Sequence, residues 1–344
     1  MKNIIKMITH ITILLIVNTN INSQSKSGEV EKQSGFITAN GITLAYESFG
    51  RPENESILMI QGTGAQLTAW PEALCKNLAR QGYRVIRFDN RDVGLSSKLD
   101  SLGMPDWASI IPAIGSCDSS FLPYSLEDMG KDVIGLMDAL KIKKAHIMGA
   151  SMGGAIAQLV AINFPERVIT MTSIMASSGN PNAAKGNSEV LGLMAAPPPR
   201  TNNREALEAY LFTIYKAIGS PGYPTEEVEL MKIIEENLDR SWYPMGSTRQ
   251  AAAVIIGENC DRRDKLKNIT VPALVIHGED DPVVNIEAGK EVASAIPNAK
   301  FVSVPGMGHD LPEALIPAIS NEIILRIKNS SSHTSVPSKA INNY

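Results

Sequence analysis

Short, continuously apolar runs recur along the chain from about residue 36, and they predict the strands of a buried sheet. The runs occupy residues 57–60, 83–88, 145–148, 168–174, 273–276 and 301–304. Most are apolar throughout rather than at every second position, which is typical of parallel strands covered by helices on both faces. We therefore expect a mostly parallel sheet at the centre of the fold.

Amphipathic helical segments lie between these runs. In residues 126–140, apolar side chains such as Met129 and Val133 recur at helical spacing, and Ser125 with Asp128 offers an N-terminal capping pair. Strand, helix and strand repeated in this order imply right-handed crossovers. The pattern predicts an α/β fold with a doubly wound sheet.

The alternation of strands and helices stops before residue 180. A stretch rich in Asn, Gly, Ala and Pro follows, and then two stretches with helical spacing and no strand between them. The strand pattern returns only near Val271. These features predict a helical cap inserted between two core strands. The predicted division is a core over residues 24–179 and 248–328 with the cap over residues 180–247.

The two ends of the chain differ from its body. Lys2 and Lys6 precede the apolar run 11–17, and small or polar residues follow, as in a signal peptide over residues 1–23. The run is too short to span a bilayer, which takes about 20 residues; an apolar first helix packed on the domain is the alternative. We expect a secreted or periplasmic protein without stable membrane insertion after cleavage, and a disordered tail over residues 329–344.

Composition and charge limit the possible partners. The chain is 44% hydrophobic and 20% charged, as soluble globular proteins are, and its formal net charge is -4 without a basic block in the body. A nucleic acid partner is therefore not expected. Cys75, Cys117 and Cys260 lack metal-ligand spacing and allow at most one disulfide, whose pair the sequence does not choose. No metal or organic cofactor is predicted, and the oligomeric state stays open.

A candidate nucleophile lies at Ser151, in a Gly-x-Ser-x-Gly pattern that starts at Gly149 and ends at Gly153. A strand precedes the pattern and an Ala-rich helix start follows it. A serine on such a sharp turn needs neighbours without side chains, and the helix N-terminus beside it favours negative charge. A purely structural glycine turn is the alternative interpretation.

A serine hydroxyl needs a base, and elimination among the five histidines leaves one candidate. His10 belongs to the N-terminal segment and His333 to the tail. His146 within a strand and His277 at a strand end are better explained as structural residues. His309 follows the last strand in a glycine-rich loop, where catalytic groups of such folds collect.

The acid that orients the base is expected after another strand, and Glu279, Asp280 and Asp281 are the available carboxylates. Asp281 fits best because Pro282 fixes the turn that follows it, and Asp280 is the second choice. The order Ser, Asp, His along the chain matches the arrangement of α/β hydrolases.

Two backbone donors are expected to stabilise an oxyanion. One is the N–H of Met152, which follows the nucleophile. The other is the N–H of Thr63, in the loop after the first central strand, where the Gln61 side chain is a further candidate contact to the substrate.

Aromatic residues outside the core are candidates for a substrate pocket. Trp107, Phe212 and Trp242 are predicted to line an apolar acyl or alcohol pocket under the cap. For Tyr210 and Tyr215, simple packing within the cap is the better interpretation.

Several motifs extend the pattern beyond the candidate triad. Residues 89–96, Asp-Asn-Arg-Asp-Val-Gly-Leu-Ser, resemble a turn of the α/β-hydrolase superfamily, which we interpret as a structural support for the oxyanion loop. Together with residues 242–244, 249–250, 261–263 and 306–312, this turn is similar to bacterial esterases of the aclacinomycin methylesterase type. The resemblance covers residues 35–328 and implies the α/β-hydrolase fold and a serine hydrolase, but no particular substrate.

The combined pattern predicts hydrolysis of a carboxylic ester of a small apolar molecule through an acyl-Ser151 intermediate. An acyltransferase, a cofactor-free haloperoxidase and an aminopeptidase are alternatives on the same triad. A non-catalytic receptor for a small ligand is the alternative outside enzymes.

Overall fold

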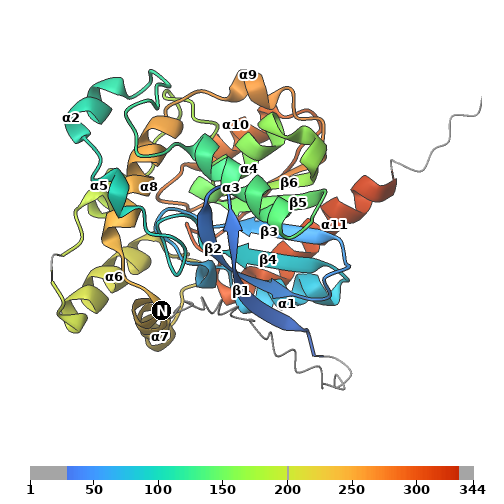
Figure 1. The fold of residues 1–344 in the computed structure, drawn as a ribbon, viewed down its shortest axis with the longest axis horizontal. Coiled ribbons are helices and arrows are strands. Elements are labelled where there is room, and N and C mark those ends of the chain that lie inside the picture. The colour runs from blue at the N-terminus through green and yellow to red at the C-terminus, as the bar shows by residue number, and fades with distance from the viewer. Residues whose placement is uncertain (1–28, 200, 333–344) are drawn as a thin grey trace, which may run out of the picture.

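In residues 29–199 and 201–332, which this computed structural model describes, eight strands form one sheet in the order β1-β2-β4-β3-β5-β6-β7-β8 (Figure 1). The parallel part consists of β3 (Ser56–Ile60), β4 (Arg84–Phe88), β5 (Ala145–Ala150), β6 (Val168–Ile174), β7 (Ala273–Gly278) and β8 (Lys300–Val304). Every predicted run therefore forms a strand, and the expected mostly parallel sheet is confirmed.

A hairpin that the apolar runs did not predict completes the sheet. It consists of β1 (Lys32–Ala39) and β2 (Ile42–Phe49), and β2 also pairs antiparallel with β4. The two-residue turn is Asn40-Gly41 with φ of 48° and 78°, a combination that Asn-Gly adopts readily in hairpins. Most of β1 is exposed or half-buried, so it carries no continuous apolar run, and only the Asn-Gly pair signals it in the sequence.

Helices cover both faces of the sheet (Figure 1). On one face pack α3 (Leu126–Ala139), α4 (Met152–Asn163) and α10 (Ile286–Ala295), and on the other α1 (Glu72–Arg80) and α11 (Ile316–Ser332). Side chains of β3 alternate between the two layers: Leu58 contacts the first and Met59 the second. The predicted capping box of Ser125 and Asp128 is present at the start of α3.

The chain between β6 and β7 forms the cap helices α5 (Ser188–Ala195), α6 (Arg204–Ile218), α7 (Glu227–Arg240) and α8 (Pro244–Gly257), grouped at one end of the sheet (Figure 1). The two predicted helical stretches correspond to α6 and α7. The predicted cap boundary after residue 247 falls within the first half of α8. Pro244 starts α8 at a position that suits proline, and the helix stays unbroken while Ala252 and Ile256 enter a core.

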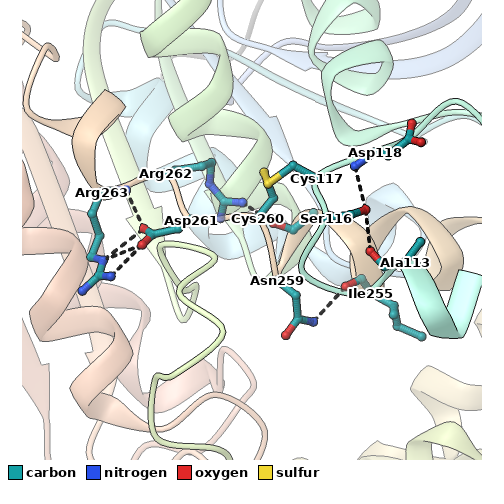
Figure 2. Close-up of a disulfide and its surroundings, with 11 residues drawn as sticks. Ala113, Ser116, Cys117, Asp118, Ile255, Asn259, Cys260, Asp261, Arg262 and Arg263 are labelled. Carbon is teal, nitrogen blue, oxygen red and sulfur yellow. Dashed lines mark hydrogen bonds and ion pairs between the residues drawn. A yellow bond between two sulfur atoms is a disulfide. The ribbon is translucent and has the colours of Figure 1, made fainter.

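A disulfide settles the pairing that the sequence left open. Cys117, in the segment that joins β4 to α3, is bonded to Cys260, which follows α8 (Figure 2). A small apolar cluster of Ile110, Ala252 and Ile256 joins the same two parts of the chain. Cys75 is buried and is the free cysteine of the described chain.

The predictions for the two ends of the chain concern residues that the structure describes only in part. The expected signal peptide, residues 1–23, lies outside the described residues, as do residues 333–344. The expected start of a disordered tail at residue 329 is wrong, because α11 continues to Ser332 while Ile323 and Ile327 anchor it in the core. None of the helices in the described ranges combines the length and apolarity needed to cross a bilayer.

Candidate active site

Ser151 lies on a sharp turn between β5 and α4. Its φ of 56° and ψ of -125° place it in a backbone region that residues with side chains rarely adopt. A Cβ on Gly149 would stand 1.9 Å from the Gly153 carbonyl oxygen, and one on Gly153 would stand 2.0 Å from the Ile60 carbonyl oxygen. Both glycines of the pattern are thus required by the close approach of neighbouring backbone.

The structure brings Ser151, His309 and Asp281 into one hydrogen-bonded chain. The Ser151 Oγ lies 2.9 Å from His309 Nε2, and His309 Nδ1 lies 2.8 Å from Asp281 Oδ2. The three residues follow β5, β8 and β7, so all three stand at the carboxyl ends of parallel strands. Asp280, the second choice for the acid, is exposed and instead accepts a hydrogen bond from the Gly306 N–H.

Four groups face the Asp281 carboxylate. Its Oδ1 accepts the backbone N–H groups of Val283 and Val284 at 2.8 and 2.9 Å, while Oδ2 faces His309. The His277 Nε2 lies 3.4 Å from the same Oδ2. Burial raises the pKa of Asp281, but His309, His277 and the backbone N–H donors outweigh it, so the pKa lies well below its ordinary value.

His277 is a residue of the site that the sequence interpretation treated as structural only. It is fully buried, and its Nε2 lies 2.8 Å from the Val284 carbonyl oxygen as well as close to Asp281. A hydrogen on Nε2 serves both acceptors. The spacing of four residues between His277 and Asp281 was the available signal, but in a turn after a strand such spacing has no fixed geometric meaning.

The end of helix α6 and the residues after it are hydrogen-bonded to the loop that carries His309. The backbone N–H of His309 donates to the Ile218 carbonyl at 2.8 Å, and that of Gly308 donates to the Ser220 hydroxyl at 2.9 Å. Ser220 also bonds to Asp310, whose pKa is raised by burial. The cap therefore contacts the loop that carries the candidate base.

The loop Gln61-Gly62-Thr63-Gly64, called the oxyanion loop below, passes directly beside Ser151. A Cβ on Gly62 would stand 3.1 Å from the Ser151 Cβ. Among the hydrogen bonds of the described residues, the backbone N–H groups of Thr63 and Met152 have no acceptor. Two free donors beside the candidate nucleophile match the requirements of an oxyanion hole.

The turn of residues 89–96 supports this loop. Asn90 Nδ2 donates to the Gln61 carbonyl at 2.9 Å, and the fully buried Asp89 accepts the backbone N–H groups of Leu67 and Leu95. Arg240 of α7 pairs with the same Asp89 carboxylate at 2.7 Å. The arrangement agrees with the supporting role that we inferred for the turn from the sequence.

A cavity of about 60 Å³ lies between the cap helices and the oxyanion loop. Its lining includes Gly64, Gln66, Leu211, Tyr215, Leu238 and Trp242. Of the candidate substrate-binding residues, Trp242 lines this cavity. Phe212 instead packs under the Lys216 ammonium group, Trp107 packs against the cluster around Ile110, and the Gln61 side chain accepts a hydrogen bond from the Gly62 N–H.

Comparison with known proteins supports the fold. The family model described as the alpha/beta hydrolase fold matches residues 55–214, and one described as TAP-like protein matches residues 253–324. The crystal structure of an enol-lactonase from Burkholderia xenovorans LB400 has a TM-score of 0.66 and 23% identity, covering 86% of this chain and 100% of that chain.

Two curated proteins are similar in sequence over most of the chain. Rhodomycin D methylesterase DauP of Streptomyces sp. strain C5 is 27% identical over 298 residues, which cover 81% of this chain and 93% of the relative. 3-Oxoadipate enol-lactonase 2 of Acinetobacter baylyi is 26% identical over 257 residues, covering 74% and 82%. Taken with the fold, these matches identify the chain as an α/β-hydrolase-fold enzyme that is similar to bacterial methylesterases.

Proposed function

We propose that this enzyme hydrolyses a carboxylic ester of a small apolar molecule, with Ser151 as nucleophile, His309 as general base and Asp281 as the acid that orients it. The observation that carries the proposal is the chain of two hydrogen bonds, 2.9 and 2.8 Å long, at the carboxyl edge of the sheet. The similar proteins are named as a methylesterase and an enol-lactonase, and both names denote the hydrolysis of an ester bond.

In the first half of the reaction, the Ser151 Oγ attacks the ester carbonyl carbon while His309 Nε2 takes the hydroxyl proton. The carbonyl oxygen becomes an oxyanion, to which the N–H groups of Thr63 and Met152 donate. When the intermediate collapses, the bond to the alcohol oxygen breaks and the His309 proton moves to that oxygen. The products are the free alcohol and an acyl ester of Ser151.

In the second half, His309 Nε2 takes a proton from a water molecule that attacks the acyl carbon. The new intermediate collapses, its bond to Ser151 Oγ breaks, and the proton returns to that oxygen. Asp281 stays ionised throughout because its lowered pKa lies far from neutral pH, and its negative charge stabilises the protonated imidazole.

The proposed substrate class rests on the cavity beside the oxyanion loop, whose lining includes Gly64 of that loop but none of the triad residues. Leu211, Leu238 and Trp242 present apolar surface beside the oxyanion loop, and the cavity there admits only a small group. These features favour a short apolar acyl or alcohol part.

Hydrolysis of p-nitrophenyl esters from acetate to octanoate tests the proposal, with purified protein and its Ser151→Ala variant. We expect turnover that falls to a small residual level in the variant and that decreases from short to long acyl chains. A folded protein without turnover on any ester would refute the esterase and favour a receptor. Equal turnover by Ser151→Ala would refute the role of the serine.

We also propose that the chain is exported and that residues 1–23 are removed as a signal peptide. The Cys117–Cys260 disulfide supports this proposal, because structural disulfides persist mainly in oxidising compartments such as the periplasm and the extracellular space.

A further inference from the structure

We propose that Gln250, on the cap helix α8, is a positioning residue that holds the oxyanion loop in its active geometry. The inference rests on the proposed function, because it assigns the residue through the oxyanion hole. Gln250 is fully buried and comes from a helix 186 residues further along the chain than the loop residue it binds.

The Gln250 side chain makes one hydrogen bond with each end of its amide. Its Oε1 accepts the backbone N–H of Gly64 at 2.7 Å, and its Nε2 donates to the Arg91 carbonyl at 2.7 Å. The amide thus ties the oxyanion loop to the turn of residues 89–96. Both bonds are short; the one to Arg91 is buried and the one to Gly64 is partly buried, and losing a partner there leaves a costly unpaired polar group.

Two hydrogen bonds tie the loop to other segments and a third lies within the loop, and the free donor lies between two of the amides involved. The Gly62 N–H donates to the Gln61 Oε1, Asn90 holds the Gln61 carbonyl, and Gln250 holds the Gly64 N–H. The Thr63 N–H lies between the two held amides and has no acceptor among the described residues. Gln250 therefore determines where the second half of the loop, and with it the Thr63 N–H, stands relative to Ser151.

Close packing keeps helix α8 in place if the contact between Gln250 and the oxyanion loop is lost. A Cβ on Gly64 would stand 2.8 Å from the Ser247 Oγ, and one on Gly246 would stand 1.9 Å from the Asp92 carbonyl oxygen. Arg249, next to Gln250, pairs with the buried Asp92 through two hydrogen bonds of 2.8 Å. Because the helix is held firmly in place, a change in the Gln250 side chain displaces the loop rather than the helix.

The test uses an alkyl trifluoromethyl ketone, which Ser151 would convert into a hemiketal whose oxyanion lies in the oxyanion hole. The fraction of active sites in each preparation is counted with a fluorophosphonate probe, so that misfolded protein does not affect the constants. For Gln250→Met we expect the inhibition constant to rise and kcat/KM to fall by the same factor, about 10-fold or more, with KM nearly unchanged.

Gln158→Met is the matched control, because Gln158 is an equally buried amide on α4 that binds Ser173 and the Ser177 carbonyl, away from the loop. We expect it to lower stability as Gln250→Met does but to leave the inhibition constant within about 2-fold, since its hydrogen bonds do not reach the oxyanion loop. Equal inhibition constants for Gln250→Met and wild type would overturn the inference.

Gln250→Asn keeps a buried amide and serves if the Met variant does not fold. Its side chain is one methylene shorter and cannot bridge Gly64 and Arg91, so we expect the same direction of change; a wild-type inhibition constant would again overturn the inference. Wild-type protein that neither turns over esters nor reacts with the fluorophosphonate would overturn the proposed function, and the inference with it. Active wild type with unaffected Gln250 variants would overturn the inference alone.

Discussion

At the scale of single residues, the main feature is a buried carboxylate whose polar contacts are all hydrogen-bond donors. Two backbone N–H groups and two imidazole nitrogens face Asp281, and none of them is another negative charge. Water is replaced by fixed dipoles, which is how a buried carboxylate stays ionised. The geometry thus supplies both the orientation of His309 and the charge that its protonated form needs.

We expect Asp281→Asn to lower kcat by roughly 10³- to 10⁴-fold, because an amide favours the wrong imidazole tautomer. Asp280→Asn is the matched control, since the exposed Asp280 side chain accepts the Gly306 N–H and lies apart from the triad hydrogen bonds, and it should retain activity within about 3-fold because an exposed side chain contributes little. Steady-state kinetics on the preferred p-nitrophenyl ester decide between them. A larger loss of kcat from Asp280→Asn than from Asp281→Asn would show that Asp280, and not Asp281, is the acid that orients His309.

The same carboxylate makes the stability depend on pH. The pKa of Asp281 is lower in the folded than in the unfolded chain, so its contribution to the free energy of unfolding is present above the ordinary carboxyl pKa of about 4 and is lost as the pH falls below it. Urea unfolding at pH 6 and pH 3.5 should show a smaller loss on acidification for Asp281→Asn than for wild type.

At the scale of elements, the β5–α4 junction combines an unfavourable backbone conformation at Ser151 with backbone contacts on both sides. Ser151 donates its N–H to the Ile174 carbonyl at 2.9 Å, which ties the turn to β6. Gly149 and Gly153 let the strand, the turn and the helix start approach closely. The strain at the serine is thus held by surrounding structure that has little room to relax.

Gly153→Ala should lower the free energy of unfolding by about 3 kcal/mol or more, because its Cβ would stand 2.0 Å from the Ile60 carbonyl oxygen. Gly192→Ala on α5 is the control: nothing lies within 4 Å of its Cβ, and alanine in a helix gains up to about 1 kcal/mol over glycine. Urea titrations measure both. Equal stabilities of the two variants would show that the turn adapts.

At the scale of the whole molecule, the sequence predicted most of the sheet and the order of the candidate triad. The buried strands were predictable because helices cover both of their faces, so their apolar runs are continuous. The β1–β2 hairpin was not predicted because β1 is largely exposed. Helix α8 was not predicted because its buried face consists of small residues, such as Ala252, together with Arg249 and Gln250. Contacts between distant segments, such as Gln250 with Gly64, leave no periodic trace in a sequence.

The proposed export concerns the whole chain, and it predicts a mass and a thiol count. Protein recovered from the periplasm or medium should lack its N-terminal segment and, when denatured without reductant, expose one thiol. That thiol is Cys75, whose pKa burial raises to about 12, so it should not react in the native protein. Intact mass and thiol titration measure both; full-length cytosolic protein with three reactive thiols would contradict export.

The Cys117–Cys260 disulfide closes a covalent ring that contains Ser151, while Asp281 and His309 lie outside it. A protease that cuts the largely exposed residues 221–226, between α6 and α7, would leave the candidate nucleophile on one fragment and its two candidate partners on the other. The disulfide would still join the fragments, so they could not diffuse apart. A chain built in this way keeps its three candidate catalytic groups in one molecule after the main chain is broken, which would suit the proposed export into an environment rich in proteases.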